Sequence, residues 1–222
     1  MKFNILTIFP NIFDSFFSES ILKRAIDKKL IEINTVNIRD FTNDKHKTVD
    51  DTPCGGGAGM VMKVEPIYKA LRKIKKNKKN RVILLTPAGK QFNQNIAKQY
   101  SKLSQLTFIC GRYEGIDARV ENFIDEKISI GHYVLNGGEV AAAAIIETVA
   151  RLIPGVLGNI KSIKEESFSA NQPFVLEYQQ YTKPEIFKAG NKKYRVPKIL
   201  LSGDHKKIKE WRIKKARSLQ TG

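Results

Sequence analysis

Two apolar runs, each followed by a glycine-bearing turn, decide the fold: RVILLTPAGK at residues 81–90 and LTFICGRYEG at residues 106–115. Residues 82–85 and 106–110 are aliphatic, β-branched and aromatic, a composition typical of strands buried on both faces. Between them, residues 92–103 carry apolar side chains at helical spacing. The order strand, helix, strand predicts a parallel sheet with a crossover helix, and hence an α/β domain.

The flanking sequence continues this pattern. Apolar runs or alternation predict further strands at residues 3–9, 31–36 and 128–130, and helical spacing predicts helices at residues 12–26, 66–74 and 140–152. A polar stretch from residue 39 to residue 60 is predicted to be a long loop. The sequence therefore predicts one α/β domain over residues 1–160.

The chain changes character beyond Pro154. Residues 161–173 lack apolar periodicity and are rich in Ser, Lys, Glu and Asn, which indicates a flexible linker. Residues 202–217 have a helix signature with Asp204 as its N-cap. We therefore expect a small, basic helical domain over residues 174–222.

The net charge of +17 is unusual for a chain of 222 residues. Self-repulsion of this size opposes compaction unless a polyanion is usually bound nearby. The last 62 residues hold 15 Lys and Arg against 6 acids and so carry +9 of the total. This clustering favours contact with nucleic-acid phosphates, although a lysine bias that merely solvates the surface is the plainer alternative.

The number of cysteines and the hydropathy of the chain indicate the cellular compartment in which the protein is expected. Cys54 and Cys110 are the only cysteines, too few to staple a domain, which is typical of a reducing environment. No apolar run approaches the ~20 residues that span a bilayer, and Pro10 and Asn11 interrupt the N-terminal apolar run, unlike a signal peptide. We expect a cytoplasmic protein without a membrane anchor.

Four glycine-bearing loops stand out: CGGGAGM at 54–60, LTPAGK at 85–90, CGRYEG at 110–115 and SIGHYVLNGGE at 129–139. Three follow predicted strands, and ligands of open α/β sheets bind beyond the carboxyl ends of the strands, where glycine lets backbone amides approach. Neither GxGxxG nor GxxxxGK[ST] occurs at these positions, which argues against a dinucleotide or an NTP. A neutral or cationic ligand fits better, although each loop alone could be an ordinary tight turn.

Taken in order, these loops resemble a known family. With RDFTNDKHKTVDDTPCGGGAGM, CGRYEGID, RLIPGVLG, YTKP and LLSGDH, the chain is similar to the bacterial tRNA (guanine-N1)-methyltransferase family, TrmD, of the SPOUT class. The resemblance implies a SPOUT-type parallel sheet whose loops at 85–90, 111–115 and 129–140 form a deep trefoil knot. It also implies an obligate homodimer whose two active sites combine residues of both chains.

The activity implied is transfer of a methyl group from S-adenosylmethionine to N1 of the guanosine immediately 3′ of the tRNA anticodon. In this family the knot holds the cofactor largely through backbone groups. The residues at the corresponding positions are Leu85, Thr86, Pro87, Gly89, Gly111, Tyr113, Glu114, Ile130, Gly131, Tyr133, Leu135, Gly137 and Gly138.

Methylation at N1 of guanine needs a base for the N1 proton and a cation for the charge that then develops on O6. The resemblance assigns the cation to Arg151 and the base to Glu166, where the family has Asp. Arg151 could instead only complement the dipole of the preceding helix, and Glu166 could share its task with Glu165 or be a solvated linker acid.

Metal binding is left open by the sequence. The family places acids at the positions of Glu114 and Glu177, near the methionine end of the cofactor, and magnesium is a further candidate ligand there. No residue is assigned as a metal ligand. His132 replaces the family's Asp and lacks a partner for a metal site or a switch.

The implied partner is tRNA, held by its anticodon stem-loop, whose target base must leave the stack to be methylated. Phosphate contacts are expected from Lys45, His46, Lys47 and the basic C-terminal helix, which carries Lys206, Lys207, Lys209, Arg212, Lys214, Lys215 and Arg217. Tyr113 and Tyr181 are candidate stacking residues. The alternatives are a SPOUT methyltransferase acting on ribosomal RNA and an RNA-binding homologue with impaired catalysis.

Overall fold

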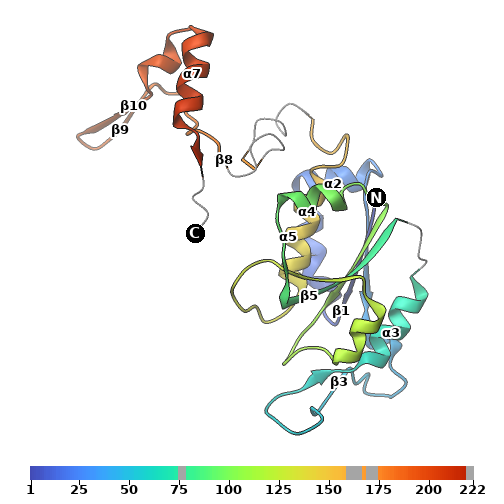
Figure 1. Cartoon of the computed structure of the whole chain (residues 1–222). Helices are drawn as coiled ribbons and strands as arrows, with labels where there is room; N and C mark the ends of the chain where they lie inside the picture. Colours follow the sequence, from blue (N-terminus) through green and yellow to red (C-terminus); the bar gives the residue numbers. More distant parts are fainter. Residues whose placement is uncertain (75–78, 159–166, 169–174, 219–222) are drawn as a thin grey trace. The chain divides into compact units, whose positions relative to one another are not determined.

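The computed structural model describes residues 1–74, 79–158, 167–168 and 175–218. The chain divides into two compact units, Met1–Gly158 and Asn159–Gly222, and each is considered by itself (Figure 1). Among the described residues, no helix has the length and apolar character that crossing a membrane requires.

A five-stranded parallel sheet forms the centre of the first unit. Its strand order is β2-β1-β6-β5-β7, with bounds Glu32–Asn37 (β2), Lys2–Thr7 (β1), Gln105–Cys110 (β6), Asn80–Gln91 (β5) and Glu126–Ser129 (β7). Every pairing in this sheet is parallel. The predicted α/β class with a parallel sheet is therefore confirmed.

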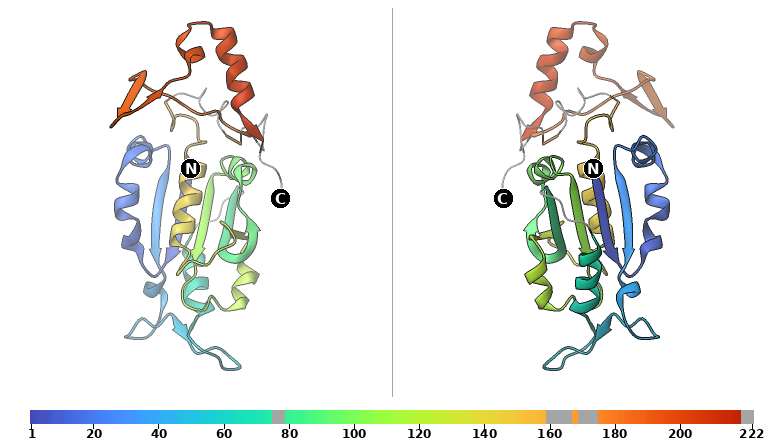
Figure 2. Two further views of the ribbon diagram at one scale, coloured as in Figure 1. Left: turned by 90° about the vertical axis from the view of Figure 1, so that its left-hand side faces the viewer. Right: turned by 90° about the vertical axis from the view of Figure 1, so that its right-hand side faces the viewer.

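Helices cover both faces of this sheet (Figures 1 and 2). Side chains alternate along each strand, so that Ile83 and Leu85 face one core and Val82 and Leu84 face the other. The first core includes residues of α2 (Ser20–Asp27), α4 (Gln94–Tyr100) and α5 (Glu139–Ala150). The second core includes residues of α3 (Val64–Lys73) and of the 3-10 helix η3 (Ala118–Phe123).

The helix predicted over residues 12–26 is wrong as a single element. The structure has three pieces there: η1 (Pro10–Phe13), α1 (Asp14–Phe17) and α2. The break falls where Glu19 is extended and Ser20 has a φ of +57°, in the left-handed region. Apolar spacing continues across the break because the pieces pack on the same core, so periodicity alone did not show it.

The predicted loop over residues 39–60 also contains structure. It begins within η2 (Ile38–Phe41), and β3 (Asp50–Asp51) pairs antiparallel with β4 (Val61–Met62). These two short strands close the CGGGAGM segment into a hairpin. Its glycines at 55, 56, 57 and 59 all have positive φ, which only glycine adopts readily.

Strand β5 is longer than the predicted strand, which ended at Leu85. It continues to Gln91, with a register shift that places both Leu85 and Lys90 opposite Ile128 of β7. The LTPAGK motif is therefore an excursion within a strand rather than a loop after it. Apolarity marked only the first half of β5, because the residues after Leu85 are polar or small.

The second unit contains α7 (His205–Lys215), whose predicted N-cap is confirmed: the Asp204 carboxylate accepts a hydrogen bond from Lys207 N at 3.1 Å. It also contains the 3-10 helix η4 (Lys198–Leu201) and two antiparallel strand pairs that the sequence did not predict. These are β9 (Ile186–Ala189) with β10 (Lys192–Arg195), and β8 (Val175–Leu176) with β11 (Arg217–Ser218). Of the predicted linker over 161–173, only residues 167–168 are described.

Candidate cofactor pocket and active site

A pocket of about 450 Å³ lies beyond the carboxyl ends of β6 and β7 and beside the point after Leu85 where β5 leaves its ladder with β7. Its wall is built from three segments that follow or interrupt these strands, at residues 84–88, 111–121 and 127–138. Small-molecule sites usually have volumes of about 300–1,000 Å³, and in open α/β sheets they lie at this edge. The pocket therefore has the size and place of a cofactor site.

The structure brings twelve of the thirteen predicted cofactor residues together in this one wall. They are Leu85, Thr86, Pro87, Gly111, Tyr113, Glu114, Ile130, Gly131, Tyr133, Leu135, Gly137 and Gly138. Gly89 is the exception, because its backbone lies against β7. A Cβ on Gly89 would overlap the backbone of Ile128, so this glycine lets β5 return to β7 after the excursion.

Glycine is required at the far wall of the pocket. The backbone N of Gly138 donates a hydrogen bond to Gly111 O at 3.0 Å, and a Cβ on Gly138 would lie 2.8 Å from Cys110 Cα. A Cβ on Gly137 would overlap the side chain of Arg112. The loop at 130–138 thus packs on the end of β6 at backbone distance, and glycine at these positions lets backbone rather than side chains form this part of the wall.

A buried ion pair that the sequence did not predict supports this loop. Arg112 Nη2 lies 3.0 Å from Glu139 Oε2, and the Glu139 side chain is 1% exposed. Thr7 Oγ1 donates a hydrogen bond to Glu139 Oε1 at 2.7 Å, and the Arg112 guanidinium lies 4.8 Å from the centre of the Phe9 ring. The pair therefore connects β1, the turn after β6 and the first residue of α5.

Glu114 gives the pocket an acidic group. Lys127 and Arg112 also line the pocket but are paired with Glu121 and Glu139. Within the described part of the chain, Glu114 forms no salt bridge. A carboxylate that forms no such pair favours a ligand that carries positive charge.

The CGGGAGM hairpin packs beside this carboxylate. Glu114 N donates a hydrogen bond to Met60 O at 3.1 Å, and Met62 N donates to Gly115 O at 2.9 Å. A Cβ on Gly59 would lie 2.5 Å from Glu114 Cγ, so glycine at this position admits the Glu114 side chain. The hairpin, although distant in sequence, is part of the structure that holds Glu114.

Cys110 lies beneath the pocket and is fully buried. Burial, and secondarily the nearby carboxylate of Glu139, raises the pKa of the Cys110 thiol well above its usual value, while Arg112 opposes this shift. The thiol is therefore protonated at neutral pH and is no candidate nucleophile.

Comparison with known proteins identifies the family. A family model described as tRNA (Guanine-1)-methyltransferase TrmD matches residues 1–221. The chain belongs to the TrmD family. The tRNA (guanine-N(1)-)-methyltransferase of Dictyoglomus turgidum is 55% identical over 216 residues, covering 97% of this chain and 85% of the relative. Those of Carboxydothermus hydrogenoformans and Clostridium botulinum strain Hall are 54% and 52% identical, covering 97% and 99% of this chain and 83% and 87% of the relatives.

Of the two expected catalytic residues, the structure describes only Arg151. Arg151 is the C-cap of α5, and its backbone N donates a hydrogen bond to Glu147 O at 3.2 Å. It does not line the pocket. Glu166 lies outside the described residues.

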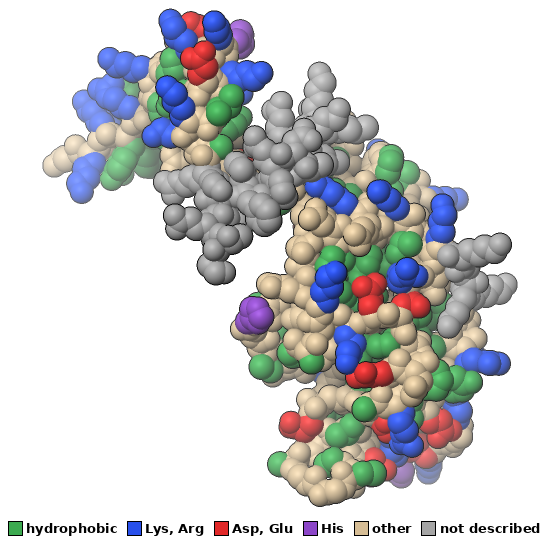
Figure 3. All heavy atoms as spheres, in the orientation of Figure 1, with side chains coloured by type: hydrophobic (Ala, Val, Ile, Leu, Met, Phe, Trp, Pro, Cys, Tyr) green, Lys and Arg blue, Asp and Glu red, His purple; other side chains and the backbone are tan. Residues whose placement is uncertain are grey.

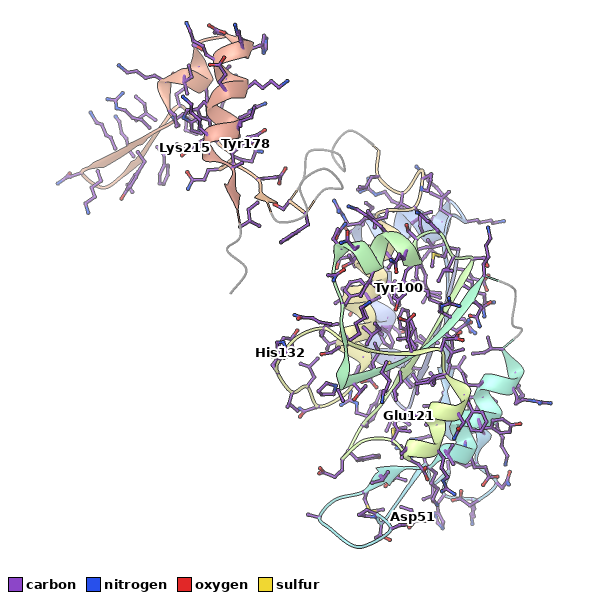
Figure 4. All side chains as sticks on the ribbon, in the orientation of Figure 1. Asp51, Tyr100, Glu121, His132, Tyr178 and Lys215 are labelled. Carbon is purple, nitrogen blue, oxygen red and sulfur yellow. The ribbon has the colours of Figure 1, made fainter. Side chains whose placement is uncertain are left out.

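The structure also describes the remaining candidate residues for metal, cofactor and base contacts. Glu177, in the second unit, donates a backbone hydrogen bond to Ser167 Oγ at 3.0 Å. Figure 4 shows His132 on the outer side of its loop, where it is exposed and does not line the pocket. Tyr181 packs on Trp211 with 6.4 Å between ring centres. No cluster of metal-ligating side chains occurs within the described ranges.

Proposed function

We propose that this chain transfers a methyl group from S-adenosylmethionine to N1 of the guanosine immediately 3′ of the tRNA anticodon. The observation that carries the proposal is the pocket at the ends of β6 and β7, where a glycine-rich wall surrounds Glu114, a carboxylate that forms no salt bridge with a described residue. Membership of the TrmD family supports both the tRNA substrate and the cofactor.

The residues present fit S-adenosylmethionine. When bound, this cofactor supplies an electrophilic methyl group on a positively charged sulfur. The backbone at Gly111, Gly137 and Gly138 approaches the pocket without side chains and would hold the cofactor's polar groups. Glu114 would favour its positive charge, and the apolar side chains of Leu85 and Ile130 would exclude water.

For the base and the cation we propose Glu166 and Arg151. Glu166 would accept the proton from guanine N1, and Arg151 would stabilise the negative charge that the departing proton leaves on O6. Both residues occupy the positions that the family uses for these tasks.

The length of α5 supports a site shared between two chains. The helix has 12 residues and rises ~1.5 Å per residue, so Arg151 lies about 18 Å along the helix axis from Glu139 at the pocket. This is farther than an arginine side chain reaches. We therefore propose a homodimer in which the Arg151 of one chain serves the pocket of the other.

Exposed apolar side chains on the first unit are consistent with such a dimer. Val134 is 86% exposed and Val140 62%, and both belong to the segment that runs from the pocket loop into α5. Phe9 and Ile12, just after β1, are 44% and 50% exposed. Apolar side chains left in water in this way often mark a protein interface.

Four finer features belong to the same proposal. We propose that the loops at 85–90, 111–115 and 129–140 form a trefoil knot, supported by the pairing of β7 with β5 on both sides of the 86–89 excursion. We propose that the small second unit contacts the tRNA with α7. The enzyme would act in the cytoplasm, with magnesium as a candidate ligand near Glu114.

The decisive experiment incubates the purified protein with S-adenosylmethionine and anticodon stem-loop transcripts. One transcript carries the target guanosine and a matched control carries adenosine there. Mass spectrometry of nuclease digests should find 1-methylguanosine only from the first. Equal methylation of both transcripts, or methylation of ribosomal RNA alone, would favour the SPOUT alternative, and cofactor binding without turnover would favour the catalytically impaired homologue.

A further inference from the structure

The β9–β10 hairpin of the second unit is exposed to solvent in the described part of the chain. Each residue from 181 to 195 is exposed, and so the eight strand residues are exposed as well. A two-stranded ribbon is at best marginally stable in water unless something packs on it. The hairpin is therefore a surface whose stabilisation depends on a partner.

One face of this ribbon carries two aromatic side chains. Phe187 and Tyr194 are directly opposite each other, with 6.3 Å between ring centres and 31° between ring planes. Phe187 is 60% exposed and Tyr194 is 56% exposed. Neighbouring rings that are largely in water offer flat surfaces on which unpaired nucleic-acid bases stack.

The same ribbon is strongly basic. Residues 186–195 contain Lys188, Lys192, Lys193 and Arg195 and no acid. Lys188 and Lys193 are directly opposite each other, an arrangement of like charges that destabilises a strand pair. None of the four cations forms a salt bridge with a described residue.

The charge and the rings point to one kind of partner. Figure 3 shows Lys and Arg side chains gathered over the ribbon and over the neighbouring α7. A polyanion relieves the repulsion between Lys188 and Lys193, whereas an apolar protein surface does not. Lys192 lies on the aromatic face, because it is opposite Ala189, two residues from Phe187. Cations and rings together match RNA with unstacked bases.

We propose that the β9–β10 hairpin binds an unpaired segment of the substrate tRNA. Bases stack on Phe187 and Tyr194, and Lys192 on the same face binds an adjoining phosphate. Lys188, Lys193 and Arg195, on the opposite face of the ribbon, bind further phosphates of the same RNA. The proposal rests on the proposed tRNA substrate and adds a contact that is separate from the cofactor pocket and from α7.

The test uses the full chain with two paired variants and one control. Lys188→Gln with Lys193→Gln removes charge from one face. Phe187→Leu with Tyr194→Leu keeps an apolar cross-strand pair but removes the aromatic rings. Lys28→Gln with Lys102→Gln neutralises two exposed lysines of the first unit. Affinity for a tRNA transcript is measured by fluorescence anisotropy at several salt concentrations, and calorimetry with S-adenosylmethionine reports on the first unit.

The expected results separate charge from stacking. The glutamine pair should weaken tRNA binding about tenfold and reduce the slope of log affinity against log salt by about two. The leucine pair should weaken binding by about tenfold or more with an unchanged slope. Cofactor affinity should not change in either variant, and the control should lose far less tRNA affinity than either pair.

Other results would overturn the proposal. Wild-type tRNA affinity in both hairpin variants would refute the hairpin contact, but it would leave the proposed methyltransferase function untouched. Loss of binding in the glutamine pair alone would refute stacking. Competition by poly-glutamate as effective as that by unlabelled tRNA would identify an acidic protein as the partner. A wild-type chain that neither binds nor methylates tRNA would instead refute the proposed function.

Discussion

Arg112 and the fully buried Glu139 form an ion pair, with 3.0 Å between Nη2 and Oε2, beside the loop at 130–138 that lines the cofactor pocket. Arg112 lies in the turn that follows β6, and Glu139 is the first residue of α5. The pair therefore joins two segments that line the pocket on either side. Gly137 lies so close to both side chains that any shift of the pair must move the loop at 130–138. The pair therefore helps to hold the loop at 130–138 in its position in the pocket wall.

Removing one partner of this pair should damage both stability and cofactor binding. Glu139→Ala leaves the Arg112 guanidinium without a counter-charge, and breaking a buried pair costs about 3–5 kcal/mol. Urea unfolding should show this loss, and calorimetry should show weaker S-adenosylmethionine binding. Glu32→Gln, which breaks the exposed pair with Lys2, is the control and should cost less than about 1 kcal/mol. Equal effects of the two substitutions would contradict the positioning role.

Arg151→Ala should strongly reduce methyl transfer without weakening cofactor binding, because Arg151 is distant from the pocket of its own chain. We expect turnover to fall by a factor of about 10²–10³, the usual cost of removing a group that stabilises developing negative charge. Glu166→Gln should behave alike, and Glu166→Asp, which restores the family's residue, should remain active. Single-turnover assays measure methyl transfer, and calorimetry measures cofactor binding. Wild-type turnover in Glu166→Gln would mean that the base is another residue. Glu165→Gln would then test the nearest candidate.

Mixed dimers test whether Arg151 acts across the interface. One chain carries Arg151→Ala and the other carries Glu139→Ala, and the cofactor concentration is kept low enough that the weakened pocket of Glu139→Ala gives little activity alone. In mixed dimers, the intact pocket of the first chain meets the intact Arg151 of the second, and activity should return. If Arg151 served its own pocket, the mixture would stay inactive at every ratio.

Gly89→Ala should destabilise the fold, because the added Cβ overlaps the backbone of Ile128 and forces β5 away from β7. Overpacking of this kind usually costs about 1–3 kcal/mol. Gly158→Ala is a matched control, since a Cβ there meets nothing within 4 Å, and it should change stability by no more than about 0.5 kcal/mol. Denaturant unfolding of both variants checks the comparison, and a neutral Gly89→Ala would contradict the close contact between the strands.

The two cysteines should differ in reactivity. Cys54 is exposed and should react with iodoacetamide in the native protein. Cys110 is buried, and its raised pKa leaves it protonated at neutral and mildly alkaline pH, so raising the pH in this range should not make it react. Intact-mass measurements should find one modification in the native protein and two in urea. Rapid native labelling of a Cys54→Ser variant would show that Cys110 is accessible.

The strands and helices that the sequence predicted well are those whose apolar pattern coincides with burial. Strands β1 and β6 are nearly fully buried, and α5 packs on the core with Ile145, Ile146 and Val149. Failures occurred where a backbone feature opposed the pattern. The left-handed Ser20 divides a region of continuous helical spacing, and the exposed β9–β10 hairpin has no alternation of apolar and polar residues to reveal it.

The candidate site was predicted through family motifs, and its geometry shows why composition could not replace them. Twelve residues converge on one pocket because β6 and β7 end at the edge of the sheet where β5 makes its excursion, which strand prediction alone indicates only in outline. The Arg112–Glu139 pair joins residues that are 27 positions apart, and no local spacing rule connects them. Gly89 is a glycine for a packing reason that appears only when β7 is placed beside β5.

The return of β5 to Ile128 fixes the length of the ligand-facing excursion. Leu85 and Lys90 both pair with Ile128 of β7, so residues 86–89 form a bulge whose two ends are fixed at the same position of the neighbouring strand. Because both ends are fixed, an inserted or deleted residue would change the shape of the part that lines the pocket. The motif should therefore tolerate exchanges of side chain far better than changes of length, and libraries that vary the enzyme's cofactor preference should keep the number of residues in this bulge constant.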